Sequence, residues 1–223
     1  MDKFRRMYVS RLFCSVVLGI FLYVVLDVTA QLLPPHYSPI SQAESDLAVG
    51  KFGFVMAINF LNRGLLSLLF ILAFLRTLDL AKVSRSQFRT GVYLLGAWAV
   101  GALLLAVFPT DVPATPVSWH GTIHLVVAII AFIGGAFGTL AISQELGQSR
   151  AFEGLKRVAQ PTSIIVVLLW AVDFALPFIS PDLNLHIGGL TERLFLGSVL
   201  LWLGVVSVYI ATHMHQVTER AEL

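Results

Sequence analysis

The sequence predicts an all-α fold: a polytopic bundle of six transmembrane helices, with both termini in the cytoplasm and a single membrane domain over residues 1–223. Composition is the first reason, because 57% of the 223 residues are hydrophobic and 13% are charged, with a mean hydropathy of +0.83. Soluble domains carry about 25% charged residues. So few charges cannot cover a water-exposed surface, and we therefore expect an integral membrane protein. The lengths of the apolar segments and the positions of the basic residues are the other two reasons.

The first three expected spans are residues 12–33, 53–76 and 91–108. A helix needs about 20 residues to cross the hydrocarbon core of a bilayer, and each segment is apolar over about that length. Pro34 follows the first span and Pro109 follows the third, and proline is a strong signal for a turn or a helix end.

The last three expected spans are residues 119–142, 161–180 and 194–214. Pro161 marks the start of the fifth span, since proline is well tolerated in the first turn of a helix. Pro181 lies in the short connection before the sixth span. The connections are too short for a soluble domain, so the chain forms one membrane unit.

Basic residues predict the orientation, because cytoplasmic loops of membrane proteins retain Lys and Arg. Of the 15 basic residues, twelve lie in the two tails and in the second and fourth connections: Lys3, Arg5, Arg6, Arg11, Arg76, Lys82, Arg85, Arg89, Arg150, Lys156, Arg157 and Arg220. The other connections hold only Lys51 and Arg193, and Arg63 lies within a span. Both termini are therefore expected in the cytoplasm.

Residues 1–30 admit one alternative, a cleaved signal peptide. They combine a basic start, an apolar stretch and the sequence Val28-Thr29-Ala30, which resembles a cleavage site. Cleavage would leave five spans. The apolar run continues past Ala30 to Leu33, which favours a helix that is retained.

Ionisable residues within the spans concentrate on the extracytoplasmic side. Charged groups in membrane helices are costly, and they usually face a bundle interior or a cavity. The residues that we expect to line a polar outer cavity, or to form ion pairs there, are Asp27, Glu44, Asn59, Asn62, Arg63, Asp173, Glu192 and Arg193. The alternative to a cavity is a set of structural ion pairs, with Arg63 bound to Asp173 or Asp27.

Two helical stripes support an inward-facing cluster. Asn59, Asn62, Arg63 and Ser67 fall on one face of the second span, where the amides could bond the arginine. In the fourth span, the face that carries His120 and His124 continues with small residues, Ala128, Ala131 and Gly135. Gly134 and Gly138 form a Gly-x-x-x-Gly pattern of the type that packs membrane helices closely.

His120 and His124 lie one helical turn apart, a spacing at which two imidazoles can bind one metal ion. Asp111 is the nearest carboxylate in the sequence, so these three are the candidate ligands of a zinc ion that would activate water. Two alternatives remain open. The histidines could bond loop carbonyls or Asp111, or they could act directly in acid–base chemistry or proton relay, since histidine titrates near physiological pH.

The first outer connection, SPISQAESDLAVGKFGF, is a second candidate for chemistry. One interpretation is a turn segment that leads into the second span. The other is a loop folded over the cavity, with Ser41 or Ser45 as a nucleophile and Glu44 or Asp46 as a ligand or a base. No nucleophile-elbow motif accompanies these serines.

Three segments, SQAESDLAVGKFGFVMAINFLNRGLLSL, GAWAVGALLLAVFPTD and HGTIHLVVAIIAFIGGAFG, resemble the prokaryotic membrane family catalogued as domain of unknown function 998. The resemblance runs from about Ser38 to the sixth span, and the pair FPTD and HGTIH is its most specific part. It implies a six- or seven-helix protein of the prokaryotic plasma (inner) membrane, without an assigned activity.

The chain is also distantly similar to the seven-helix membrane hydrolases of the alkaline ceramidase and progestin/adiponectin receptor superfamily. That resemblance implies a serine, an aspartate and three histidines around zinc. Ser41, Asp111, His120 and His124 match by residue type, whereas the third histidine has no clear counterpart and the number of spans differs.

The function that we predict is a membrane-embedded hydrolase of a lipid or a lipid-linked substrate, with zinc as its candidate cofactor. Asp111, His120 and His124 would form its centre, and Ser41 and Asp46 are further catalytic candidates. One alternative is a transporter, channel or sensor that uses Arg63 and Asp173, and another is an accessory protein. The expected partner is the lipid bilayer, and no nucleic-acid signature is present.

Overall fold

The computed structural model of the chain describes residues 2–112 and 115–219 and confirms the all-α prediction. The long helices are α1 (Asp2–Leu32), α2 (Gly53–Leu80), α3 (Arg89–Leu105), α4 (Trp119–Leu146), α5 (Glu153–Ile179) and α6 (Pro181–Glu219). Short 3-10 helices lie in three connections: η1 (Glu44–Ala48), η2 (Arg85–Phe88) and η3 (Arg150–Phe152). Among the described residues, six helices are long and apolar enough to cross a membrane. The protein is therefore an integral membrane protein.

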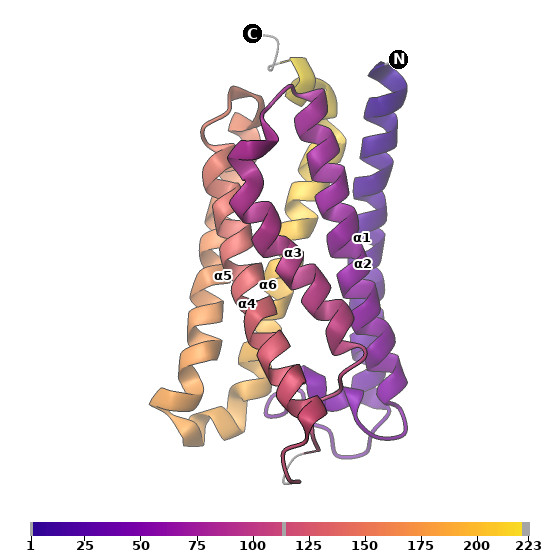
Figure 1. Cartoon of the computed structure of the whole chain (residues 1–223), viewed down its shortest axis with the longest axis vertical. Coiled ribbons are helices and arrows are strands. Elements are labelled where there is room, and N and C mark those ends of the chain that lie inside the picture. The colour runs from indigo at the N-terminus through magenta and orange to yellow at the C-terminus, as the bar shows by residue number, and fades with distance from the viewer. Residues whose placement is uncertain (1, 113–114, 220–223) are drawn as a thin grey trace.

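The helices run along one long axis, and both termini lie at the same end of the bundle (Figure 1). Each helix packs against the next one in the sequence, and α6 packs against α1, so the six helices close into a ring. We call the end that carries the termini the inner end and the opposite end the outer end, following the orientation that the basic residues predict. The connection that contains η1 lies at the outer end (Figure 1).

Helices α5 and α6 begin earlier than the predicted spans. The helix predicted to start at Pro161 begins at Glu153, so Pro161 and Pro177 lie inside α5. Membrane helices tolerate interior proline where neighbouring groups satisfy the nearby backbone, and here the Ala159 carbonyl accepts hydrogen bonds from Ser143 Oγ and Trp202 Nε1, both at 3.1 Å. Helix α6 begins at Pro181, because proline suits the first helical position.

Close packing of α4 on α3 depends on the predicted glycine pair. A Cβ atom at Gly134 would collide with the carbonyl oxygen of Leu94, and one at Gly138 would lie 2.8 Å from the nitrogen of Leu95. The Gly-x-x-x-Gly pattern therefore lets the two backbones approach each other, as predicted.

The inner half of the bundle is filled with aromatic rings. Phe74 stacks on Phe70 with 6.1 Å between the centroids, meets Phe88 edge-on at 5.3 Å, and lies 6.4 Å from Phe152. These four side chains are all buried. They form a buried aromatic layer in the inner half of the bundle.

Candidate functional site

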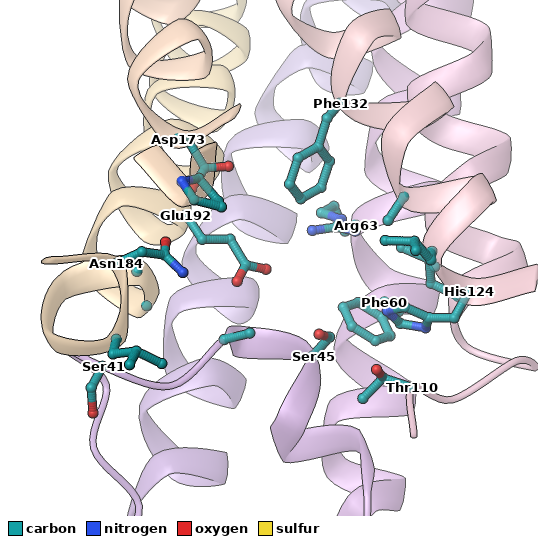
Figure 2. A pocket seen from close by; sticks show the side chains of 18 residues that line it. Ser41, Ser45, Phe60, Arg63, Thr110, His124, Phe132, Asp173, Asn184 and Glu192 are labelled. Atoms are coloured by element: carbon teal, nitrogen blue, oxygen red, sulfur yellow. The ribbon is translucent and has the colours of Figure 1, made fainter. Parts of the chain in front are cut away.

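A cavity of about 370 Å³ lies in the outer half of the bundle. Helices α2, α4, α5 and α6 contribute its polar side chains Arg63, His124, Asp173, Asn184 and Glu192. Figure 2 shows the carboxyl groups of α5 and α6 on one side of the cavity, with Arg63 and His124 on the other. The prediction of a polar cavity in the outer half therefore agrees with the structure.

Arg63 is buried at the wall of this cavity without a carboxylate partner. Its side chain is 1% exposed, and its guanidinium carbon lies 5.1 Å from the ring centroid of Phe60 and 4.8 Å from that of Trp98. Within the described residues, Arg63 forms no ion pair, and its Nε has no hydrogen-bond partner. The predicted ion pairs of Arg63 with Asp173 or Asp27 are therefore not formed, and aromatic faces take their place.

The polar stripe of α2 holds these aromatic faces in position. Ser67 donates a hydrogen bond to the Arg63 carbonyl at 2.7 Å and accepts one from Trp98 Nε1 at 3.1 Å. Asn59 is also fully buried. Asn62 turns away from the cavity, since its amide donates to the Gly19 carbonyl on α1 at 2.9 Å. The predicted stripe thus divides between the cavity wall and the α1–α2 interface.

Glu44 enters the bundle from the first outer connection. Its Oε1 accepts a hydrogen bond from the Tyr23 hydroxyl at 2.6 Å, while its backbone N–H donates to Glu192 Oε2 at 3.2 Å. The side chain is 1% exposed, and Oε2 has no partner within the described part of the chain. Burial raises the pKa of Glu44 from 4.5 to about 7, although the positive charge of Arg63 opposes this shift.

Asp173 is held on the α5 side of the cavity by one hydroxyl group. Thr191 Oγ1 donates to Asp173 Oδ1 at 2.9 Å. Thr191 and Glu192 are neighbours on α6, so the same helix turn positions both carboxyl groups at the cavity. Figure 2 shows Asp173 and Glu192 close together on that side.

His124 is buried, and the structure fixes the direction of its ring. Its Nδ1 lies 2.8 Å from the carbonyl oxygen of Phe108. A carbonyl can only accept, so we assign the proton of the neutral imidazole to Nδ1, which leaves Nε2 as an acceptor. The prediction of a histidine that bonds a loop carbonyl is confirmed for His124. This residue also lines the cavity, so its free nitrogen is available for chemistry there.

The predicted zinc ligands are not assembled. Asp111 serves the start of α4, where its two oxygens accept from Ser118 Oγ at 2.5 Å and from Ser118 N at 3.0 Å. These hydrogen bonds lower the pKa of Asp111. His120 packs on Trp119, with 3.4 Å between the ring centroids. Among the described residues, no group of three or more His, Cys, Asp or Glu side chains is placed to hold a metal ion.

The serines of the first outer connection lie at the cavity, as one interpretation predicted, but without an activating base. Ser41 and Ser45 line it together with Ala43, and no hydrogen bond joins either hydroxyl to His124 within the described chain. Asp46 instead lines a shallow depression near Tyr37, away from this cavity. The structure therefore does not join a serine, a histidine and Asp46 into a catalytic set.

Asp27 and Arg193 lie outside the main cavity, which corrects the prediction of a single polar site. They line a separate cavity of about 340 Å³ between α1 and α6. Arg193 Nη1 donates to the carbonyls of Pro39 and Gln42 at 3.0 and 2.9 Å, and Nη2 contacts the Tyr37 hydroxyl. Arg193 thus fastens the first outer connection to α6.

Tyr23, Thr191 and Asn184 are site residues that the sequence did not identify. Tyr23 lies four residues before Asp27, and this helical spacing is the only sequence signal for it. Thr191 precedes Glu192, but its contact with Asp173 depends on how α5 and α6 pack. Asn184 lies in a segment that was predicted as a connection, whereas the structure places it in the first turns of α6.

The family model described as "Protein of unknown function (DUF998)" matches residues 17–209. The chain belongs to the DUF998 family. The match includes every residue that lines the main cavity, so this site lies within the DUF998 region. No curated protein and no solved structure matches the chain. The resemblance to DUF998 is thus confirmed, whereas the similarity to the alkaline ceramidase and progestin/adiponectin receptor superfamily is not.

Proposed function

We propose that this DUF998 protein is a membrane-embedded hydrolase that acts on a lipid or a lipid-linked substrate in the extracytoplasmic leaflet of a prokaryotic plasma membrane. The observation that carries the proposal is His124. Its Nδ1 is held by the Phe108 carbonyl, and within the described residues its other ring nitrogen has no hydrogen-bond partner in a cavity that also contains Arg63 and two carboxyl groups. Clefts with a few convergent polar groups are the usual location of active sites.

Access from the lipid supports a membrane substrate. Leu125 of α4 lines the cavity and is also 61% exposed on the lipid-facing side of the helix. Pro177 of α5 lines the same cavity. A substrate with an acyl or prenyl chain could therefore enter between α4 and α5 while its chain stays in the bilayer.

The proposed reaction is acid–base hydrolysis. His124 Nε2 takes a proton from a water molecule, and the oxygen of that water attacks the carbonyl carbon or the phosphorus of the substrate ester. The ester bond to the leaving oxygen then breaks, and the protonated imidazole of His124 gives that oxygen the proton that it took from water. This returns His124 to its neutral form and completes the cycle without any step at Asp111 or His120.

His124→Gln tests this proposal, with His120→Gln as the matched control. Glutamine can still donate to the Phe108 carbonyl, but it cannot act as a base near neutral pH. With purified protein in lipid nanodiscs and product release measured by mass spectrometry, we expect kcat to fall by about 10²–10⁴-fold for His124→Gln. We expect little change for His120→Gln. Equal activity of the two variants, or no turnover by the unmodified protein across a lipid extract, would contradict the proposal.

A non-enzymatic sensor is the second candidate, and the unpaired Arg63 favours it. A buried guanidinium that forms no ion pair within the described residues is suited to binding an anion whether or not chemistry follows. The aromatic layer around Phe74 argues against a channel, because it places buried apolar rings in the inner half of the bundle. Arg63-dependent ligand binding without product would support a sensor, and Arg63-dependent flux into proteoliposomes would support a transporter.

A further inference from the structure

We infer that the cavity binds a zwitterionic phospholipid headgroup, with the phosphate on Arg63 and the primary ammonium on Asp173 and Glu192. This inference rests on the proposed function in that it names the substrate class of the same site. It starts from one feature of the structure. The cavity holds a buried cation and two carboxyl groups that form no ion pair with one another in the described chain.

The cation side of the cavity is suited to phosphate. Arg63 is 1% exposed, and its nitrogens point into the cavity in Figure 2. Phe60 and Trp98 cover the guanidinium, and its Nε has no hydrogen-bond partner in the described chain. An arginine that is oriented by aromatic rings and leaves its N–H groups free matches the planar, bidentate recognition of phosphate oxygens.

The carboxyl side of the cavity is suited to an ammonium group. Asp173 Oδ1 accepts from Thr191, and Glu192 Oε2 accepts from the backbone N–H of Glu44. One oxygen of each carboxyl group therefore remains for a ligand, and the cavity lining in the described chain includes no lysine and no arginine other than Arg63. A simple anion would meet repulsion from these two groups when they are ionised, whereas a zwitterion satisfies both sides at once.

The size and the opening of the cavity fit a headgroup that is still attached to its lipid. About 370 Å³ lies at the low end of the range of about 300–1,000 Å³ for small-molecule sites, so the cavity accommodates a headgroup but not a whole phospholipid. The lipid-exposed Leu125 and Pro177 of the facing helix mark where the acyl chains would leave.

Native mass spectrometry with defined lipids tests the inference. The protein is offered equimolar phosphatidylethanolamine and phosphatidylglycerol, which share the phosphate but differ in the ammonium group. We expect the unmodified protein to retain phosphatidylethanolamine about 10- to 100-fold better, the value of one charge-assisted hydrogen-bonded contact. Equal retention of the two lipids, or a preference for phosphatidylglycerol, would overturn the inference.

Two variants assign the two charges to their residues. Arg63→Met should lower the retention of both lipids by about 10- to 100-fold, because the phosphate loses its partner. Asp173→Asn keeps the acceptor for Thr191 and should remove only the preference between the two lipids. Unchanged retention in Arg63→Met, or an unchanged preference in Asp173→Asn, would contradict the assignment.

Further experiments distinguish an attached headgroup from a free one, and the lipid-binding inference from the hydrolase proposal. Free phosphoethanolamine that displaces the lipid at an equal concentration would contradict a site for an attached headgroup; weak displacement supports it. Selective retention without product supports the inference while the hydrolase proposal fails. Hydrolysis of both lipids at equal rates without selective retention overturns the inference and leaves the hydrolase proposal standing.

Discussion

The outer and inner halves of the bundle are built from the same helices, but the outer half encloses a polar site and the inner half is packed with apolar side chains. Helix α2 carries Arg63 in its outer half and the buried rings of Phe70 and Phe74 further inward. The outer part encloses a polar cavity, whereas the inner part is packed with aromatic side chains. Residues that line the cavity and residues that stabilise the fold by packing are therefore separated along the helix axis.

Unsatisfied polar groups follow the same division. Of the six buried side-chain atoms without a hydrogen-bond partner in the described chain, five belong to outer-half residues: Asp27, Glu44, Asn59, Arg63 and Arg193. Such groups cost free energy of folding. Stability is often sacrificed in this way where a site must bind a ligand, and tight packing elsewhere offsets the loss.

The largest expected effect lies in the inner half. Phe74→Ala should lower the free energy of unfolding by about 3–5 kcal/mol, because it opens a cavity among Phe70, Phe88 and Phe152. Leu72→Ala is the control, since Leu72 is 40% exposed on the outside of the same helix. Unfolding by denaturing detergent measures both. Equal losses for the two variants would show that the aromatic layer is not the main source of stability.

The ionisation of Glu44 should make the folding stability depend on pH, because this carboxyl group is buried in the outer half of the bundle. Its pKa in the folded protein is about 7 against an ordinary value of 4.5, so the folded protein keeps this proton to a higher pH than the unfolded chain does. Folding stability should therefore fall as the pH rises from about 4.5 to 7, by at most about 3 kcal/mol.

Glu44→Gln should remove this dependence, because glutamine keeps an acceptor for Tyr23 but does not ionise. Stability of the variant and of the unmodified protein should agree near pH 4.5 and diverge as the pH rises to about 7, with the variant more stable. Thermal unfolding between these pH values is the measurement. Parallel curves for the two proteins would show that Glu44 does not ionise against a burial penalty.

A smaller effect should come from the contact between α3 and α4. Gly138→Ala places a methyl group against the backbone of Leu95 and should cost about 1–3 kcal/mol. Gly96→Ala is the matched control, because a Cβ atom there meets nothing within 4 Å. We expect the control to be neutral or slightly stabilising, since alanine favours helix more than glycine does. Destabilisation of similar size in both variants would contradict the close-packing account.

Sequence reasoning predicted the fold well because membrane helices are encoded by length and composition. The six spans were each found, and the main error was the extent of α5 and α6. Pro161 was read as a helix start, yet α5 begins at Glu153, because packing within the bundle compensates for an interior proline. Helix α6 was predicted to begin at residue 194, but it begins at Pro181, which suits the first helical position, and so it includes Asn184 and Glu192.

The candidate site was predicted in part. The cavity is lined by four of the predicted residues, Arg63, Asp173, Glu192 and His124. They could be predicted to lie at a similar depth because depth in the membrane can be counted from the sequence. Rotation about each helix axis cannot be counted in this way, so Asp27 was not recognised as facing a different cavity.

Local competition for hydrogen bonds also escaped prediction. Asp111 has the right position in the sequence for a third metal ligand, but Ser118 occupies both of its oxygens at the start of α4. His120 stacks on its neighbour Trp119 instead of turning with His124 into the bundle. A ligand spacing in the sequence does not reveal that a nearer partner already uses the side chain.

Thiol labelling in intact cells tests the central claim, a polar cavity that opens at the extracytoplasmic side and is closed on the cytoplasmic side. The exposed Cys14 is first replaced by serine. Ser45→Cys then places a thiol at the cavity, and Ser86→Cys places one on the exposed inner connection. With a membrane-impermeant maleimide, we predict that Ser45→Cys reacts from outside the cell and that Ser86→Cys reacts only after the membrane is permeabilised. The reverse pattern, or labelling of Ser45→Cys only after permeabilisation, would contradict the account.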